Sequence, residues 1–521
     1  MKKKIGALLL TAFVTATLFS GCGAKSTGGE AKKATKTLVY AQGADPRGLD
    51  PAYVDDGESA KVIVNVYEGL VRYKSDSTEI EPALATEWKV SDDGKEYTFK
   101  LREGVKFHDG TPFNADAVKF SIERQLPPKI TDEMPYASFT FGPVDKVEKI
   151  GDYEVKIILK QPYTPFLANL AMCLAAPIVS PAAVEKNGGK LMETPVGTGP
   201  FKFVKWDKGQ SITLEKNADY WGDKAKSDKV IFKFVKENSV RASELIAGSA
   251  DIIDGVDPND VKKIEDSKLQ IFKGQGMNIN YMAFNASRAP FNDPKLREAL
   301  SYAINREELV KFLYQGYSSL AETPLPSFIP GYNDKAKAYG YDPDKAKQLL
   351  KELGKENLEI KMITYSNPRP YNPVNGQKLA EAVQGYLAKV GVKATIDVYP
   401  WTEYKPKAAQ GEGDIMFYGW IGDNGDADNF LSLFDSNEIK STLNVAKYSN
   451  PKVDELLAKG RMTPSGDERN AVYKEIQELV LKDAAWLPIS NAQDMAAYSP
   501  KVKNFRLHPT GVVFLAGVEK E

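Results

Sequence analysis

An α/β fold is indicated most clearly by residues 379–398, LAEAVQGYLAKVGVKATIDV. The apolar residues of its first part recur at the spacing of one helix face and are Leu379, Val383, Tyr386, Leu387 and Val390. Gly391 follows directly and is typical of a helix end, since glycine accepts the left-handed backbone conformation without strain. Ile396 and Val398 then alternate with polar residues, which predicts a strand. A helix that leads directly into a strand is typical of an α/β lobe.

Similar patterns elsewhere predict further strands and helices. Residues 87–101 contain two alternating runs on either side of Asp93-Gly94, which predicts a β-hairpin with one face in water. Asp293-Pro294 is typical of a helix start, with aspartate as the cap and proline at the first helical position. Other strands are predicted over 153–159 and 229–235, and other helices over 294–304 and 467–482. The first half is therefore predicted to be rich in strands and the second half more helical.

The composition is that of a large globular protein. A chain of 521 residues exceeds the size at which one hydrophobic core stops growing, so two or more domains or lobes are expected. Hydrophobic residues make up 42% and charged residues 27%, which argues against disorder and against a multi-span membrane protein. Lys and Arg number 69 against 70 Asp and Glu, so no overall charge favours nucleic acid as a partner.

The N-terminus indicates the compartment. Residues 1–21 combine three lysines with an apolar run that is short for a membrane span, as in a secretory signal peptide. The run ends in LFSGC (18–22), which resembles a bacterial lipobox, so we expect cleavage before Cys22 and lipid on its sulfur. An ordinary signal peptide with a chance cysteine is the alternative. Residues 22–37 would then form a lipidated, flexible tether that holds an extracytoplasmic protein at the cell membrane.

Common catalytic and metal-binding motifs are missing. G-x-S-x-G, H-E-x-x-H and G-x-x-x-x-G-K-[ST] do not occur, which argues against a nucleophile-elbow hydrolase, a zinc peptidase and a P-loop enzyme. With two cysteines and two histidines, a disulfide framework and a His/Cys metal cluster are nearly excluded. We therefore expect no enzyme activity, no cofactor and no metal site.

Three weaker features have ordinary structural interpretations. His108 lies beside Asp109, but no nucleophile motif accompanies it, so we interpret it as a histidine of a surface turn. Cys173 lies in an apolar stretch, where a thiol usually behaves as a small buried hydrophobic group. The acidic run 423–429 indicates calcium only weakly, because the ligand order of an EF-hand fails and no glutamate lies eleven positions after Asp423.

A series of short motifs resembles a known family. In chain order the motifs are ATEW (85–88), YTFKLR (97–102), GVKFHDG (104–110), PVGTGPF (195–201), Asn217 with Tyr220-Trp221, and REALSYAIN (297–305). Together they closely resemble the signature of family 5 of the bacterial extracellular solute-binding proteins, the peptide/nickel class that supplies ABC importers. The resemblance spans nearly all of the chain after the signal peptide.

The resemblance implies the type II periplasmic-binding-protein fold. Two α/β lobes would be joined by hinge segments, with an extra subdomain inserted in lobe I and the ligand engulfed between closing lobes. The expected boundaries are 38–275 for lobe I, about 73–195 for the inserted subdomain, 276–494 for lobe II and 495–521 for the return to lobe I.

Two segments are similar to the dipeptide-binding members of the family in particular. They are RPYNP (369–373) and GWIGDNGDADNF (419–430), and the second departs mainly at Ala427, where proline would be expected. The resemblance implies that Arg369 binds the carboxylate of a peptide and that Asp423 binds its ammonium group. A free dipeptide is a zwitterion, so a guanidinium and a carboxylate at a fixed separation would select both charge and length.

Three aromatic residues accompany these segments. Tyr371, Trp401 and Trp420 are expected to wall the pocket with rigid apolar surface that tolerates varied side chains. Without the resemblance, each of them is as well explained as a core residue, Arg369 as a solvated loop charge and Asp423 as a turn residue.

The expected function is capture of dipeptides or short peptides and their delivery to an ABC permease by a lipid-anchored monomer. The alternatives within the family are proteins that bind longer oligopeptides, murein peptides, haem or nickel complexes. Outside the family, a secreted peptidase and a structural surface protein remain as alternatives.

Overall fold

A computed structural model describes residues 35–440 and 443–521. Cys22, the predicted signal peptide and most of the predicted tether lie outside the described residues. Within the described ranges, no helix combines the length and hydrophobicity needed to cross a bilayer.

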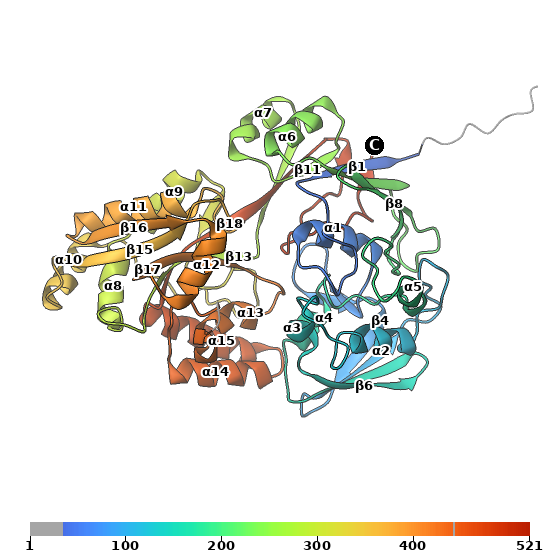
Figure 1. The fold of residues 1–521 in the computed structure, drawn as a ribbon, viewed down its shortest axis with the longest axis horizontal. Helices are drawn as coiled ribbons and strands as arrows, with labels where there is room; N and C mark the ends of the chain where they lie inside the picture. Colours follow the sequence, from blue (N-terminus) through green and yellow to red (C-terminus); the bar gives the residue numbers. More distant parts are fainter. Residues whose placement is uncertain (1–34, 441–442) are drawn as a thin grey trace, which may run out of the picture. The chain divides into compact units, whose positions relative to one another are not determined.

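A mixed sheet of twelve strands runs through the described part of the chain (Figure 1). Its order is β16-β15-β17-β13-β18-β11-β1-β10-β9-β8, with β12 and β14 also paired to β18. The strands are β1 (Thr37–Gln42), β8 (Phe201–Asp207), β9 (Ser211–Lys216), β10 (Lys229–Phe234), β11 (Ile252–Asp254), β12 (Gln270–Gln275), β13 (Asn278–Phe284), β14 (Ser318–Leu320), β15 (Glu359–Tyr365), β16 (Lys393–Tyr399), β17 (Ile415–Ile421) and β18 (Trp486–Tyr498).

Strand β18 belongs to two groups of strands. Its first residues, from Trp486 to Ser490, pair antiparallel with β13, while Ala496 to Tyr498 pair antiparallel with β11. Strand β13 and the strands before it in the order given above form the sheet of lobe II, and those after β18 form the sheet of lobe I. One long strand thus links the two halves of the sheet, next to the chain passage from β12 to β13.

A smaller sheet lies in the segment between α1 and β8. Four antiparallel strands pair in the order β4-β5-β7-β6, namely β4 (Ala85–Val90), β5 (Glu96–Leu101), β6 (Val144–Gly151) and β7 (Glu154–Leu159). Short strands β2 (Val71–Tyr73) and β3 (Ile80–Pro82) pair beside it, and β19 (Val502–Lys503) pairs with β20 (Glu519–Lys520) near the C-terminus. The hairpin predicted over 87–101 is confirmed, with Tyr97, Phe99 and Leu101 buried on one face.

The helices are α1 (Gly57–Val66), α2 (Ala115–Glu123), α3 (Ala137–Phe141), α4 (Phe166–Leu170), α5 (Pro181–Lys186), α6 (Asn238–Ala247), α7 (Val261–Asp266), α8 (Pro294–Tyr302), α9 (Arg306–Tyr314), α10 (Pro343–Glu352), α11 (Gly376–Lys389), α12 (Trp401–Gln410), α13 (Asp428–Leu431), α14 (Pro451–Met462) and α15 (Asp467–Lys482). About half of the helices, among them α1, α2, α8 and α14, begin after a residue whose side chain caps the first turn. Asp293 caps α8 by accepting a hydrogen bond from the Lys295 amide, as predicted. Helix α15 occupies the predicted range 467–482.

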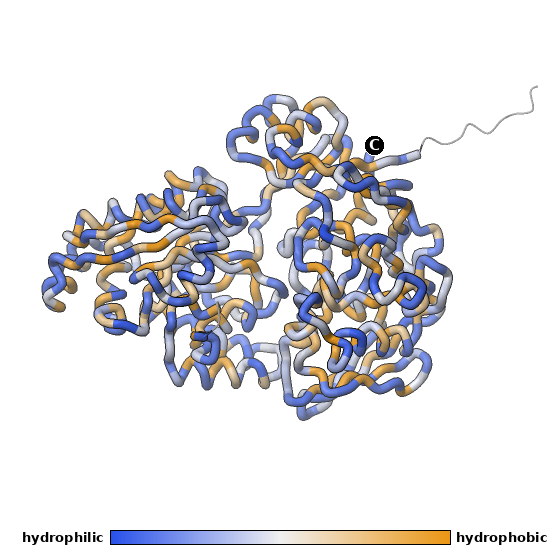
Figure 2. Tube along the Cα trace, in the orientation of Figure 1, coloured by the Kyte–Doolittle hydropathy of each residue, from blue (hydrophilic) through white to orange (hydrophobic). Residues whose placement is uncertain are grey.

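Separate hydrophobic cores define the lobes. The largest core draws only on residues between Met277 and Ile489, a second joins 38–252 to 496–518, and a third lies within 70–178. Figure 2 shows hydrophobic stretches along the lobe II strands. The sequence pattern did not predict several of these strands, because β13 is buried at all seven positions and therefore lacks alternation. The predicted α/β fold with two lobes and an additional subdomain is confirmed.

Candidate functional site

The predicted site residues come from three segments at one edge of the lobe II sheet. Strands β15, β16 and β17 are parallel to one another, so their carboxyl ends meet at the same edge. Arg369 and Tyr371 follow β15, Trp401 follows β16, and Asp423 follows β17. Open α/β sheets bind ligands in the crevice outside the carboxyl ends of their strands.

Arg369 is held by a tight turn. Its amide donates to the carbonyl of Asn372 at 2.9 Å, and the Asn372 amide donates back at 2.8 Å. Asn372 is itself fixed, because its side-chain amide donates to the hydroxyl of Tyr365 at 3.0 Å. The Arg369 guanidinium lies over the ring of Trp401, with 4.1 Å between its carbon and the ring centroid. This stacking fixes the plane of the guanidinium.

The guanidinium of Arg369 lacks the anion that such a group normally contacts. Its Nε is buried and has no hydrogen-bond partner, and no described carboxylate forms an ion pair with it. Most buried arginines of the described chain contact acids, as Arg124 does with Asp50, and buried Arg297 donates to backbone carbonyls instead. A partly buried cation without an anion is costly, so Arg369 is suited to bind the carboxylate of a ligand.

Aromatic rings surround this turn. Tyr365 makes edge contacts with Tyr371 and Trp401, and Trp401 also contacts Tyr404 and Tyr418. Tyr371 is 3% exposed, and its hydroxyl has no hydrogen-bond partner among the described residues. Burial raises the pKa of Tyr371, although the charge of Arg369 lowers it. Tyr371 and Trp401 therefore serve both as core residues and as neighbours of Arg369.

Asp423 follows the last residues of β17. Its amide donates to Oδ1 of Asn429 at 3.1 Å, and the indole of Trp420 donates to the same oxygen at 2.8 Å. The carboxylate of Asp423 accepts a hydrogen bond from the hydroxyl of Tyr136 at 2.8 Å. Burial raises the pKa of Asp423, while the hydrogen bonds of Tyr136 and Asn429 lower it.

Asp423 is one of the residues that line a large cavity. Its volume is about 1510 Å³, and its walls are mostly residues of lobe I and of the segment near the C-terminus. Tyr73, Cys173 and Phe514 line it together with Asp423. Burial raises the pKa of the Cys173 thiol to about 12, so the thiol stays protonated although it faces a cavity.

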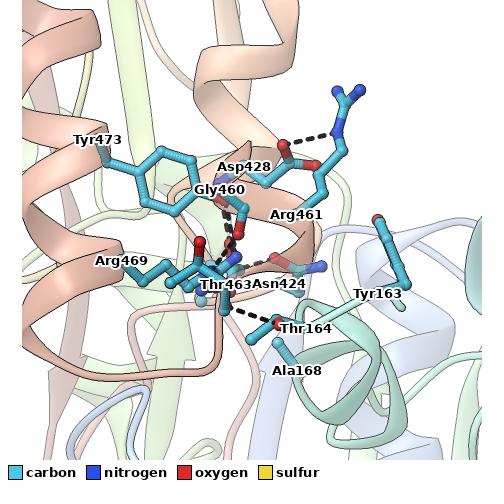
Figure 3. Close-up of polar contacts among 12 residues, drawn as sticks. Tyr163, Thr164, Ala168, Asn424, Asp428, Gly460, Arg461, Thr463, Arg469 and Tyr473 are labelled. Carbon is cyan, nitrogen blue, oxygen red and sulfur yellow. Dashed lines mark hydrogen bonds and ion pairs between the residues drawn. The ribbon is translucent and has the colours of Figure 1, made fainter. Parts of the chain in front are cut away.

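The other acids of the 423–429 segment contact arginines. Arg469 binds Asp426 through both terminal nitrogens, at 2.7 and 2.8 Å. Arg461 donates to Asp428 at 2.9 Å (Figure 3). Among the described residues, no group of three or more histidines, cysteines or acids is placed to hold a metal ion. The weak calcium interpretation therefore gains no support from this segment.

The five predicted site residues form two clusters. Arg369, Tyr371 and Trp401 lie together, while Trp420 and Asp423 share Asn429. No hydrogen bond, ion pair or ring contact joins Arg369 to Asp423 within the described residues.

Tyr136 contacts a predicted site residue, Asp423, and the sequence did not predict this contact. It immediately precedes the short helix α3, and no local pattern links it to a segment 287 residues away. His108 also differs from its prediction: it lies in a turn, but its ring is half-buried and contacts the Gly199 carbonyl at 3.0 Å. Burial lowers its pKa to about 4.

Known proteins resemble this chain over most of its length. The family model "Bacterial extracellular solute-binding proteins, family 5 Middle" matches residues 79–442. Heme-binding protein A of Haemophilus influenzae is 38% identical over 517 residues, which cover 94% of this chain and 93% of that protein. The dipeptide-binding protein of Escherichia coli is 35% identical over 503 residues, with 91% and 93% covered.

A solved structure has the same fold. The crystal structure of a dipeptide binding protein from Pseudoalteromonas sp. SM9913 in complex with Met-Leu gives a TM-score of 0.77 at 29% identity. The match covers 93% of this chain and 100% of that one.

Proposed function

Because this chain belongs to family 5 of the bacterial extracellular solute-binding proteins, which bind substrates for ABC importers and are not enzymes, we propose that its substrate is a dipeptide. The two charged ends of the peptide would be bound by Arg369 and Asp423. Tyr371, Trp401 and Trp420 would wall the site.

One observation carries this proposal. At the carboxyl ends of neighbouring parallel strands, one half-buried guanidinium and one half-buried carboxylate both lack an ionic partner within the described chain. Leaving either charge desolvated is unfavourable, and a zwitterion supplies both missing partners at once. Arg369 supplies the planar fork that suits a carboxylate, and Asp423 accepts the hydrogens of an ammonium group.

The relatives support more than one substrate class. A relative named for haem and a relative named for dipeptides are similarly close to this chain. Neither histidine of this chain presents an open ring nitrogen to haem iron: both nitrogens of His508 have partners, Thr510 and the Ser77 carbonyl, while Nε2 of His108 contacts the Gly199 carbonyl and its Nδ1 is buried. The two unpaired charges favour a zwitterionic peptide.

Calorimetric titration of the purified mature domain tests the assignment. The ligands are Met-Leu, N-acetyl-Met-Leu, Met-Leu amide, a pentapeptide and haem. Met-Leu is expected to bind, and each blocked form is expected to lose about 2–5 kcal/mol because one charge of the protein stays unpaired. Equal or tighter binding of the pentapeptide would move the assignment to oligopeptides. Binding of haem alone would replace the peptide assignment.

Site variants are matched to the two ends of the ligand. Arg369→Ala should weaken binding of Met-Leu but have little further effect on Met-Leu amide. Asp423→Asn keeps the shape of the side chain and should weaken Met-Leu but not the acetylated form. Loss of binding to every ligand in both variants would contradict separate binding of the two ends.

Localisation and partners complete the proposal. We infer that Cys22 is lipidated after cleavage of residues 1–21, and that the monomeric domain is held at the outer face of the cell membrane near its permease. Closure would occur about the passages near residues 275 and 494. Globomycin treatment of expressing cells should leave the uncleaved precursor if the lipoprotein signal is correct.

A further inference from the structure

Residues 423–429, here called the acidic loop, carry three aspartates in seven positions. The charge of Asp426 raises the pKa of Asp428, so three unneutralised carboxylates in so short a loop would repel one another. An ammonium ligand needs one ionised carboxylate at a fixed place, so the charges of the other two aspartates must be neutralised.

Arg469, in the first turns of α15, neutralises Asp426. It contacts both carboxylate oxygens, at 2.7 and 2.8 Å, and both side chains are at most 10% exposed. Two further bonds hold Arg469: Nε donates to the Gly460 carbonyl at 2.7 Å and Nη2 to the Tyr473 hydroxyl at 2.7 Å. These bonds fix the guanidinium between α14, α15 and the acidic loop.

Arg461, near the end of α14, neutralises Asp428. Its Nε donates to Asp428 and its Nη1 to Asp435, each at 2.9 Å. The backbone around Arg461 is tied to the inserted subdomain, because Thr164 donates to the carbonyls of Arg461 and Thr463, both at 2.8 Å. Figure 3 shows the bond between Arg461 and Asp428, and Thr164 next to Thr463.

Three consecutive residues of the acidic loop contact the inserted subdomain. Asp423 accepts from Tyr136, the Asn424 side chain donates to Asn169 at 2.6 Å, and the Gly425 amide donates to the Tyr73 hydroxyl at 3.0 Å. Within the described chain, Asp423 is the aspartate of this loop that no arginine contacts.

We propose that Arg469 and Arg461 are positioning residues for ammonium recognition, which hold the acidic loop so that Asp423 alone offers an unpaired carboxylate. The inference rests on the proposed function, since it concerns the ammonium end of the same ligand. Neither arginine is assigned a contact with the ligand.

The test measures an ammonium preference, defined as the affinity for Met-Leu divided by that for N-acetyl-Met-Leu. In Arg469→Met, Asp426 stays buried without its partner and the loop loses its bidentate support. We expect the preference to fall at least tenfold while the affinity for the acetylated peptide stays within about twofold, because Arg369 lies in another segment. Arg469→Lys keeps the charge but not the planar fork and should restore the preference only in part.

Two further variants keep the test decisive if Arg469→Met folds poorly. Tyr473→Phe removes one acceptor of Arg469 and should lower the preference less than Arg469→Met. Arg306→Met is the matched control, because Arg306 is a buried arginine of lobe II that pairs with Glu322, away from the acidic loop. Arg306→Met should leave the preference unchanged.

The pH profile separates positioning from a general structural effect. The titratable groups around Asp423 are Tyr136, Tyr73 and Cys173 of the inserted subdomain and Asp426 and Asp428 of its own loop. Without Arg469, the negative charge of Asp426, three positions from Asp423, is no longer neutralised. We expect this charge to disfavour ionisation of Asp423, so the preference should disappear at a higher pH than in the wild type. A wild type without an ammonium preference would overturn the proposed function and this inference together. A clear preference that Arg469→Met retains, with an unchanged pH profile, would overturn this inference alone.

Discussion

The hydroxyl of Tyr136 donates to Oδ1 of Asp423 at 2.8 Å, across 287 residues of sequence. Tyr136 belongs to the inserted subdomain and Asp423 to lobe II, so the proposed ammonium site contains a group from each. The bond favours the charged form of a carboxylate that burial otherwise disfavours.

Replacing Tyr136 by phenylalanine should therefore change the pH dependence of binding. An ammonium ligand needs the ionised carboxylate, and its affinity is lost as the pH falls through the pKa of Asp423. Without the hydroxyl that pKa rises further, so the loss begins at a higher pH than in the wild type. Titrations of Met-Leu at pH 5.5, 6.5 and 8 measure this. Tyr153→Phe is the control, since Tyr153 lies in the same subdomain, in the turn between β6 and β7 and away from Asp423. Identical profiles for Tyr136→Phe and wild type would refute the prediction.

Exchange of Arg369 for lysine should not be conservative. The guanidinium stacks on Trp401 at 4.1 Å and offers two parallel donors, whereas an ammonium group offers a point charge. We expect Arg369→Lys to weaken Met-Leu by about 10–30-fold, or about 1.4–2 kcal/mol, with a small effect on Met-Leu amide. Calorimetry of both ligands checks this. Arg288→Lys is the control: Arg288 forms an exposed ion pair with Asp414, and this variant should bind both ligands as the wild type does. If Arg369→Lys lost equal affinity for both ligands, Arg369 would only support the fold.

The sequence predicts elements that depend on neighbouring residues better than contacts between residues far apart in the chain. Helix α15 and the hairpin over 87–101 follow from local periodicity, and the structure confirms both. The segment positions of Arg369 and Asp423 were predicted through the resemblance, and the parallel strands explain why the two segments share one edge of the sheet.

Contacts between distant segments were not predictable in the same way. Arg469 reaches Asp426 from 43 residues away, and nothing in the pattern of α15 distinguishes it from a solvated helix arginine. Tyr136 and Asp423 belong to elements that meet only once the lobes have folded. These contacts form through tertiary packing, and no short stretch of the sequence predicts them.

Asp494 should make stability depend on pH. It lies on β18 opposite Gly274, and burial raises its pKa to about 7, although Lys61 lowers it. Because the folded pKa lies above the unfolded value of about 3.9, its contribution is fully present below pH 4 and is lost as the pH rises towards 7. Asp494→Asn should therefore be more stable than wild type by about 2 kcal/mol at pH 8, a value reduced for partial exposure, and by less at pH 5.

Urea unfolding of the mature domain at pH 5 and pH 8 measures this difference. Asp219→Asn is the control, because the side chain of Asp219 is 82% exposed and should leave the pH dependence as it is in the wild type. An equal loss of stability in Asp494→Asn at both pH values would show that the charged form is needed in the fold.

Gly419 of β17 leaves the space that Tyr371 occupies. A Cβ at this position would collide with the ring of Tyr371 and would lie 2.7 Å from the carbonyl oxygen of Ile279, so Gly419→Ala must displace the ring. Tyr371 lies in the turn that holds Arg369, and we therefore expect Gly419→Ala to weaken Met-Leu at least tenfold and to destabilise lobe II by about 1–3 kcal/mol. Calorimetry and urea unfolding report the two effects. Gly385→Ala is the matched control: it lies inside α11 with open space around it and should stabilise the protein by about 0.5–1 kcal/mol without changing affinity. Unchanged affinity in a folded Gly419→Ala variant would mean that the position of the Tyr371 ring does not control the Arg369 turn.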